Sequence, residues 1–346
     1  MGRVTPEGNS GADVRFCTLA DARYFPGLVA LVNSLRLLGH HEPISVLDLG
    51  LTDAQRAALA PECDFVPVPP GPPRHAWLLE PVASLARPAE VVVYLDADII
   101  VTRPLHDLIE RARLGKVVVF PDTQADRWFA EWRELFELTQ PPRRQVYVNA
   151  GFLAVSTRRF PVLLPRWAHA CELIIGRPTV KDDPEAMDSP IGLSSQDALN
   201  ALLMSEVPTG AIDLQPAGAE VHRRQLPLVQ VRDVRTLECS FEGNPTTLLH
   251  HWGAPKPWDH AARGYMVNAY STCLRRLLVE QDVAVRINPR EVPHWLRPGL
   301  WGRVAHFAVR HSVPAARRLR ERLRRRAPQP GEPVPLVLVP ADASNR

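Results

Sequence analysis

An uninterrupted apolar stretch ends in two aspartates at residues 91–98, which read Val-Val-Val-Tyr-Leu-Asp-Ala-Asp. A short continuous apolar run of this kind is typical of a strand that is buried on both faces of a parallel sheet. Asp96 and Asp98 then follow the carboxyl end of the strand, where open α/β sheets bind their ligands. Two carboxylates at that place suit a hard divalent cation that carries a phosphate.

The pattern along the rest of the chain alternates between strands and helices. Strands are predicted at 14–19, 44–49, 65–68, 91–95, 117–120, 146–156 and 246–250. Helices are predicted at 24–38, 52–60, 76–85, 105–113, 127–138, 159–175, 196–204 and 260–280, and a mobile surface loop at 176–194. This alternation predicts an α/β fold with one Rossmann-like, mostly parallel sheet flanked by helices.

The 346 residues divide by composition into a main domain and its appendages. A disordered leader is expected at 1–13, the main domain at 14–280, a basic aromatic helical extension at 281–326 and a Pro-rich disordered tail at 327–346. The net charge of +3 hides an asymmetry, because residues 281–346 hold 13 basic against 5 acidic residues and residues 1–280 hold 28 against 33. A basic surface for nucleic acid is therefore not expected on the main domain.

The five cysteines are an odd number at wide spacings without a Cys-x-x-Cys pair, which argues against a disulfide framework and a zinc site. No signal peptide and no apolar run long enough to span a membrane is found. A cytoplasmic protein is therefore expected. The segment 294–326 interleaves aromatic residues with ten arginines and one acid. This composition favours peripheral contact with the inner face of an anionic membrane as much as a solvated basic helix.

The Asp-x-Asp pair can also have a purely structural role, since such pairs also cap helices or form ion pairs. Its place after a buried strand favours metal binding over a structural role. A haloacid-dehalogenase phosphatase also carries Asp-x-Asp after a strand. There, however, the strand is usually the first one, and a Thr or Val stands two residues beyond the second Asp, where this chain has Ile100.

A second polar stretch, from His250 to Trp258, follows the apolar pair 248–249 and reads His-His-Trp-Gly-Ala-Pro-Lys-Pro-Trp. A neutral His250 imidazole can complete a metal site begun by two aspartates. Gly253 lets backbone approach a ligand, and Lys256 offers a point charge to a phosphate. Only three lysines occur in the chain, against 38 arginines. The alternative is a Pro-stiffened surface turn with a packed Trp258.

These residues together carry a resemblance to a known family. Four blocks stand in the order of its signatures: Tyr94-Leu-Asp-Ala-Asp-Ile-Ile-Val101, Asn149-Ala-Gly-Phe-Leu-Ala-Val-Ser156, Gln196-Asp-Ala-Leu-Asn200 and His250-x-x-Gly253-x-x-Lys256-Pro-Trp258. They resemble glycosyltransferase family 8, the GT-A-fold family that includes glycogenin and the lipopolysaccharide galactosyl- and glucosyltransferases. Residues 18–28 resemble its first strand and nucleotide-binding turn. The resemblance covers about residues 14–270.

The resemblance implies a metal-dependent, retaining transferase that uses a nucleotide sugar, commonly a UDP-sugar. Asp96, Asp98 and His250 would bind Mn²⁺ or Mg²⁺, with Ala97 between the two aspartates. Asp21 would lie near the nucleotide base, and Gly253 and Lys256 on the diphosphate. Asn149, Ala150 and Gly151 would lie under the sugar and the acceptor. Gln196 would lie at the anomeric face and Asp197 on the donor hydroxyls. A dication and an ammonium suit the charge that grows on a departing diphosphate.

Each of these residues also has a structural reading. Residues 149–151 suit a strand bulge, Gln196 and Asp197 the first turn of a helix, and Asp21 a turn. The shared order and spacing of the blocks favours function. The chain departs from the family at three places, where Arg23, Glu80 and Ser195 stand instead of an Asn, a basic residue and an acid.

The sequence thus predicts a glycosyltransferase that moves a hexose from a nucleotide diphosphate to a glycan or lipid-linked glycan. Two alternatives stay open, a catalytically silent nucleotide-sugar-binding protein and a metal-dependent phosphohydrolase. Slow hydrolysis of the donor would distinguish the transferase from the silent binding protein. Release of phosphate from a phosphomonoester would identify the phosphohydrolase. A sugar-phosphate nucleotidyltransferase is disfavoured, because residues 18–28 lack its Gly-rich loop.

Overall fold

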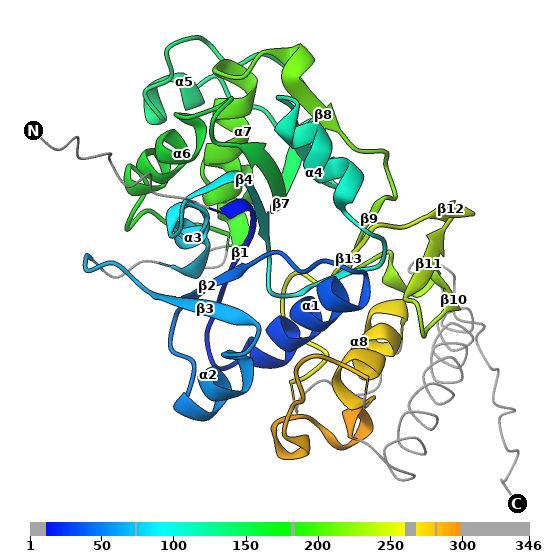
Figure 1. Ribbon diagram of the computed structural model, residues 1–346. Coiled ribbons are helices and arrows are strands. Elements are labelled where there is room, and N and C mark those ends of the chain that lie inside the picture. Colours follow the sequence, from blue (N-terminus) through cyan, green and yellow to red (C-terminus); the bar gives the residue numbers. More distant parts are fainter. Residues whose placement is uncertain (1–11, 73–74, 181–183, 260–267, 281, 298–346) are drawn as a thin grey trace, which may run out of the picture.

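The computed structural model describes residues 12–72, 75–180, 184–259, 268–280 and 282–297. Its longer strands are β1 (Ala12–Ala20), β2 (Ile44–Asp48), β3 (Cys63–Pro67), β4 (Ala89–Leu95), β6 (Val117–Pro121) and β7 (Val148–Ser156). Its helices are α1 (Phe25–Leu37), α2 (Asp53–Leu59), α3 (Glu80–Leu85), α4 (His106–Arg113), α5 (Trp132–Leu135), α6 (Leu163–Glu172), α7 (Ser195–Ser205) and α8 (Ala269–Val279). Figure 1 shows these helices around a central sheet.

The main sheet has seven strands in the order β3-β2-β1-β4-β7-β6-β8, where β8 is Ile212–Leu214. Neighbours from β3 to β4 are parallel, β7 is antiparallel to both β4 and β6, and β6 is parallel to β8. The predicted α/β class with one mostly parallel sheet flanked by helices is therefore confirmed. The carboxyl ends of β1, β2, β4 and β6 meet at one edge, together with the amino end of β7.

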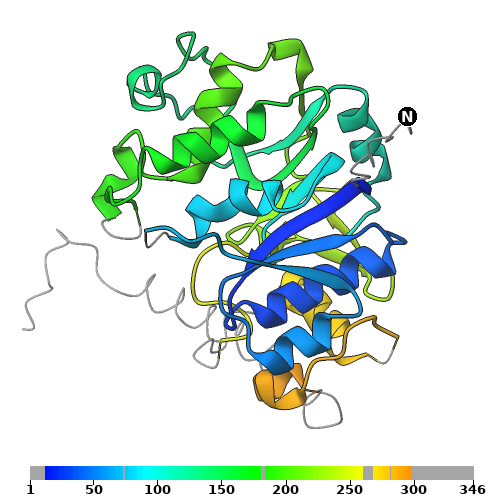
Figure 2. The ribbon, with the colours of Figure 1, turned by 60° about the vertical axis from the view of Figure 1, so that its left-hand side comes forward.

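Both faces of the sheet are buried at β4, which explains why residues 91–95 of this strand form a continuous apolar run. In β4, Val91, Val93 and Leu95 pack with α1, α2 and α8 in one core cluster. The alternate residues Val92 and Tyr94 pack with α3, α6 and α7 in the other. Figure 2 shows the blue helices α1 and α2 on one side of the sheet and the green α6 and α7 on the other.

A second, three-stranded sheet joins the first beyond the two aspartates. Its strands are β5 (Ile99–Val101), β13 (Leu248–His250) and β9 (Glu220–His222), in the order β5-β13-β9. β13 is antiparallel to β5 and parallel to β9. A third sheet contains β10 (Gln230–Asp233), β11 (Glu238–Phe241) and β12 (Asn244–Pro245). The short strands β5 and β8–β12 were not predicted, because two to four residues carry too little periodicity.

The helix predicted at 127–138 is wrong over most of its length, since only Trp132–Leu135 is helical. Tertiary contacts hold the start of this segment in an irregular form. Tyr147 N–H donates to the Ala125 carbonyl, and the Trp128 indole donates to the Pro142 carbonyl. Tertiary bonds therefore override the amphipathic pattern that indicated a helix.

The folded chain continues past the predicted end of the main domain at residue 280. Val285, Ile287, Trp295 and Leu296 are buried in the same core cluster as α1 and α8. The Asn33 side chain of α1 fixes this segment by hydrogen bonds to both the backbone N–H and the carbonyl of Val285. Trp295 is therefore a packing residue and is not available to a membrane. Residues 298–326 of the predicted interfacial helix, and the tail after them, lie outside the described residues.

All five cysteines are free and buried. Among the described helices, none is both long enough and apolar enough to cross a bilayer.

Candidate functional site

Four aspartates lie where parallel strands end at one edge of the main sheet. Asp21 follows β1, Asp48 ends β2, Asp96 follows β4 and Asp122 follows β6. Because these strands run in the same direction, their carboxyl ends bring the four side chains to a common edge. The predicted position of Asp96 at the end of a buried strand is thus confirmed.

Asp96, Asp98 and His250 lie together, as predicted. His250 Nε2 is 3.2 Å from Asp98 Oδ1 and 3.5 Å from Asp96 Oδ2. Antiparallel pairing of β5 with β13 sets His250 opposite Ile99, one residue beyond Asp98. One potential ligand atom from each of the three residues lies within 4.8 Å of the others. Three N/O ligands that converge in this way fit a divalent cation.

Glu220 fixes the proton on His250, and no sequence pattern had singled it out. Its side chain is fully buried, and its Oε1 lies 2.8 Å from His250 Nδ1. A carboxylate accepts only, so Nδ1 carries a proton and Nε2 is the ring atom that faces the aspartates. Nε2 is buried and has no aligned hydrogen-bond partner. An orphaned nitrogen between two carboxylates fits a metal ligand.

Gly151 leaves the room that this cluster needs. A Cβ built on it would lie 2.6 Å from His250 Cε1 and 2.9 Å from Asp96 Oδ2. Any side chain at this position would enter the space between the proposed metal ligands. The backbone of Gly151 also holds the site, because its carbonyl accepts the Asp96 N–H at 2.9 Å.

The charges at the cluster shift its acids and bases strongly. Burial raises the pKa of Asp98, but Lys256 and His250 outweigh burial and lower it well below its usual range. Burial alone would lower the pKa of His250, whereas Asp98, Asp96 and Glu220 raise it well above its usual value. Without a metal, a proton on His250 Nε2 therefore partly balances the negative charge of the carboxylates, which a bound dication would otherwise balance.

Lys256 lies inside this cluster rather than on an open surface. It is 3% exposed, its Nζ donates to Asp98 Oδ2 and to the His251 carbonyl, and it lies 5.0 Å from the Tyr24 ring centroid. Gly253 has a φ of +77°, which favours glycine. Trp258 is packed at 4% exposure against Gly27, where a Cβ would also meet the Ala97 carbonyl.

Asn149 and Gln196 converge on Asp122, a residue that was not predicted to belong to the site. Backbone N–H groups of Gly151 and Ala150 donate to Asn149 Oδ1 at 2.8 Å and Gln196 Oε1 at 3.0 Å. Both side-chain amides then donate to Asp122 Oδ2, at 3.1 Å and 3.3 Å. The amide oxygens are thus occupied by backbone, and the site presents amide N–H donors and a half-buried carboxylate.

Asp197 is buried in an internal network next to Gln196. Its carboxylate is 0% exposed and accepts hydrogen bonds from Arg127, Tyr147 and the Leu193 N–H. Burial raises the pKa of Asp197, and Arg127 opposes that rise. In this geometry the Asp197 carboxylate is engaged by protein groups and holds the start of α7.

Arg127 extends the same network into the predicted loop at 176–194. Its guanidinium donates to the Met187 and Ser189 carbonyls at 2.5 Å and 2.6 Å. The described part of the loop, which includes the short 3₁₀ turn Pro184–Asp188, is therefore tied through Arg127 to Asp197 at the start of α7. The prediction of a mobile loop missed this anchor.

Two of the three departures from the family pattern face each other. Ser195 Oγ donates to Glu80 Oε2 at 2.8 Å, and both side chains are buried. The third, Arg23, is exposed and lies 3.9 Å from Asp259. Tyr94 lies on the face of the sheet that packs with α3, α6 and α7. Its hydroxyl donates a hydrogen bond to Asp96 Oδ1 at 2.8 Å and so orients that carboxylate.

Asp21 lies at a hollow of about 510 Å³ beside the carboxyl ends of β1 and β2. Asp48, two prolines and aliphatic side chains complete its wall: Leu49, Val68, Pro69, Pro72 and Leu79. Asp21 Oδ1 accepts the N–H groups of Arg23 and Tyr24, so it also forms the turn that the structural reading expected. A flat apolar ring with polar edges fits such a wall.

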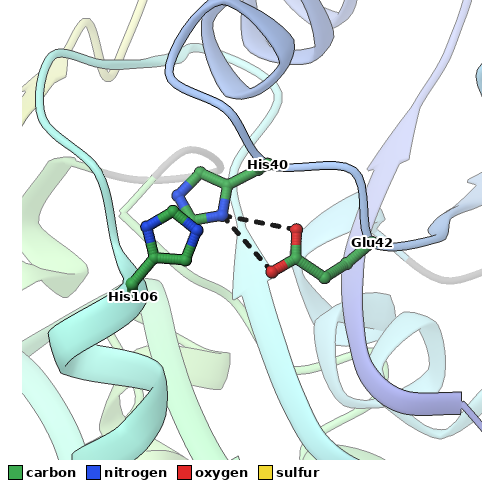
Figure 3. A group of neighbouring side chains, drawn as sticks. All are labelled: His40, Glu42 and His106. Carbon is green, nitrogen blue, oxygen red and sulfur yellow. Dashed lines mark hydrogen bonds and ion pairs between the residues drawn. The ribbon is translucent and has the colours of Figure 1, made fainter.

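A different His–Glu cluster lies at the opposite, amino edge of the sheet and contains His40, Glu42 and His106 (Figure 3). The two imidazoles stack with centroids 4.3 Å apart, and His40 Nδ1 lies 3.3 Å from Glu42. The Leu105 N–H donates to His40 Nε2 at 2.9 Å. Since Nε2 must keep a lone pair for that bond, the proton lies on Nδ1, the atom that would have to bind a metal. This cluster therefore does not fit a metal site.

No protein-family model matches the chain, and no curated protein sequence matches it. The chain is similar to the galactosyltransferase LgtC in complex with donor and acceptor sugar analogues, at 17% identity and a TM-score of 0.49, over 78% of this chain and 98% of that one. An active-site mutant of LgtC is similar at 18% identity and a TM-score of 0.47, over 76% of this chain and 94% of that one. The apo bifunctional glycosyltransferase WbbM is similar at 14% identity and a TM-score of 0.49, over 80% of this chain and 51% of that one. At these identities and TM-scores the likeness shows nothing about the activity of this chain.

Proposed function

We propose that this chain is a metal-dependent glycosyltransferase of the GT-A type, which transfers a hexose from a nucleotide diphosphate sugar. The observation that carries the proposal is the position of the buried His250 Nε2 between Asp96 and Asp98. Glu220 holds a ring proton on Nδ1, so that Nε2 is the atom left to bind a metal. Two further features support it. The Asp122, Asn149 and Gln196 group lies at the same edge, and the four sequence blocks resemble family 8.

In this proposal the carboxyl edge binds the donor in three parts. The hollow at Asp21 and Asp48 takes the base and ribose. Asp96, Asp98 and His250 hold Mn²⁺ or Mg²⁺, which would stabilise the charge that grows on the leaving diphosphate. Asn149 and Gln196 donate to sugar hydroxyls through their amide N–H groups, and Gly151 leaves space for the sugar. UDP is the proposed nucleotide, on the strength of the resemblance.

Asp197 receives a positioning role in this proposal rather than contact with the donor hydroxyls. Its bonds to Arg127 and Leu193 hold the first turn of α7, from which Gln196 extends to Asp122. Asp122 is then the carboxylate next to the reacting sugar, in reach of an acceptor hydroxyl. A glycan or lipid-linked glycan is the proposed acceptor.

Slow hydrolysis of the donor tests the proposal without knowledge of the acceptor. The full chain is incubated with Mn²⁺ and a panel of UDP-hexoses, and released UDP is measured. Release from at least one donor is expected, and EDTA or Asp98→Asn should abolish it. UDP binding without any turnover would favour a silent binding protein. Release of phosphate from a phosphomonoester, indifferent to the nucleotide, would favour the phosphohydrolase and contradict the proposal.

A further inference from the structure

Lys256, the basic residue that the resemblance assigns to the diphosphate, is fully engaged by the protein. Its ammonium donates to Asp98 and to the His251 carbonyl, and its remaining side faces the Tyr24 ring. At 3% exposure it has little surface to offer a ligand. Contact with a phosphate would also take away the cation that balances buried Asp98. Another cation is therefore needed at the outer surface of this turn.

Arg223 is placed to supply it. It follows the carboxyl end of β9, and parallel pairing sets His222 beside His250, so the chain leaves both strands at the same edge. Arg223 Nη1 donates to the Ala254 carbonyl and lies 3.4 Å from the position of a Cβ on Gly253. The guanidinium thus lies over the one residue of the turn that has no side chain to cover it.

The charge of Arg223 is not balanced within the described structure. It is partly exposed, and among the described residues it forms no ion pair with a carboxylate, whereas Lys256 pairs with Asp98. The other titratable groups of the edge are mostly acids, with Asp96, Asp98 and Glu220 close to His250. An anion at the Gly253 turn would meet the Arg223 guanidinium, whose charge no carboxylate of the described residues balances.

We infer that Arg223 binds the diphosphate of the nucleotide directly, while Lys256 serves as the counter-charge of Asp98. The inference rests on the proposed function, since it assumes a nucleotide diphosphate at this edge. One N–H of the guanidinium is used on Ala254, and its remaining donors form the planar fork that matches phosphate oxygens. Gly253 allows the close approach, because a side chain there would stand beside Arg223 Nη1.

Calorimetric titration of the full chain in Mn²⁺ tests this inference, with UDP and uridine as the two probes. Arg223→Ala should weaken UDP by roughly 10- to 100-fold, as expected for loss of charged hydrogen bonds, and leave uridine within twofold. Arg223→Lys should recover part of the UDP affinity, because it keeps the charge and loses the fork. Arg224→Ala is the matched control, since Arg224 is the exposed next residue, and it should bind UDP like the wild type.

Three results would overturn the inference. Arg223→Ala could leave UDP affinity within twofold of the wild type. It could weaken UDP and uridine equally and lower the melting temperature without ligand, which would make Arg223 a structural support of the turn through Ala254. Failure of the wild type to bind UDP in Mn²⁺ is a separate outcome, and it would remove the proposed function together with this inference.

Discussion

At the carboxyl edge of the sheet a buried histidine lies among three carboxylates, whereas at the amino edge another buried histidine lies beside one. Both donate a ring proton toward a glutamate, His250 to Glu220 and His40 to Glu42. Their other nitrogens differ, since His250 Nε2 faces Asp96 and Asp98 while His40 Nε2 accepts a backbone N–H. Residue types alone do not separate the two clusters, but the position of the proton does.

The largest expected effect comes from Asp98, which pairs with Lys256 and is a proposed metal ligand. Asp98→Asn should abolish the extra stabilisation that UDP gives in Mn²⁺ over EDTA. At a ligand concentration 100-fold above Kd, the wild-type effect corresponds to about 2.7 kcal/mol. Thermal unfolding with UDP measures it, and Glu42→Gln at the amino edge is the matched carboxylate control. Retention of the Mn²⁺ effect in Asp98→Asn would contradict the assignment of the metal ligands.

The space at Gly151 offers a second test of the carboxyl edge. Gly151→Ala places a methyl group against His250 and Asp96, so Mn²⁺-dependent UDP binding should fall by at least about 100-fold, or about 2.7 kcal/mol. Gly210→Ala is the control, because a Cβ there has open space. Normal Mn²⁺ binding by Gly151→Ala would mean that the cation lies elsewhere.

Glu220 and Glu42 allow the two clusters to be compared by the same substitution. Glu220→Leu should weaken Mn²⁺ by about 10- to 100-fold, because the proton on His250 Nδ1 loses its acceptor. Glu220→Gln should lose less, since an amide oxygen still accepts from Nδ1. Glu42→Leu should leave Mn²⁺ affinity unchanged. Titration calorimetry measures the Mn²⁺ affinity of each variant. Equal losses of Mn²⁺ affinity in Glu220→Leu and Glu42→Leu would show that the two edges do not differ in metal binding.

His40 should matter for stability and not for metal. His40→Ala leaves the Leu105 N–H buried without its acceptor, which should lower the free energy of unfolding by about 1–3 kcal/mol. Urea unfolding measures this loss, and His41→Ala, an exposed neighbour, is the control. A His40→Ala protein of wild-type stability would show that the Leu105 bond does not form.

The smallest expected effect is a pH dependence of opposite sign at the two histidines. Burial lowers the pKa of His40 below 6.5, so the unfolded chain takes up the proton first and stability falls as pH falls below about 6.5. In EDTA, the pKa of His250 is raised, so its contribution is complete below pH 6.5 and is lost as pH rises through the higher folded value. Each slope is at most about 1.4 kcal/mol per pH unit.

Urea unfolding of the wild type, His40→Gln and His250→Gln across pH 5–8 in EDTA separates these contributions. The His40 substitution should flatten the loss at acid pH, and the His250 substitution should flatten the loss at alkaline pH. Slopes of the same sign at both residues would contradict the proton positions described above.

The same contrast shows what could be predicted from the sequence. Asp96 and Asp98 were found because a continuous apolar strand ends at them, and His250 because a Gly-containing turn follows it. Glu220 could not be found, since its three-residue strand has no periodicity and meets His250 only through the pairing of β9 with β13. Arg127 was assigned to a helix by the amphipathic pattern of its segment, and its ion pair with Asp197, 70 residues away, left no local signal. Local pattern therefore indicated the proposed metal ligands but not the residues that hold them.

The fold followed from pattern more fully than the site did. The buried strand β4 has a continuous apolar signal over residues 91–95, and the helix predicted at 52–60 contains α2. The pairing of Glu80 with Ser195 needed the structure, because 115 residues separate the two side chains.

The most direct test counts Mn²⁺ ions on the full chain by electron paramagnetic resonance in a titration without nucleotide. If Asp96, Asp98 and His250 bind the metal, the wild type has one tight Mn²⁺ site, which is absent in His250→Ala and unchanged in the double variant His40→Ala, His106→Ala. A tight site that survives His250→Ala and disappears in the double variant would place the metal at the amino edge and refute the assignment of His250.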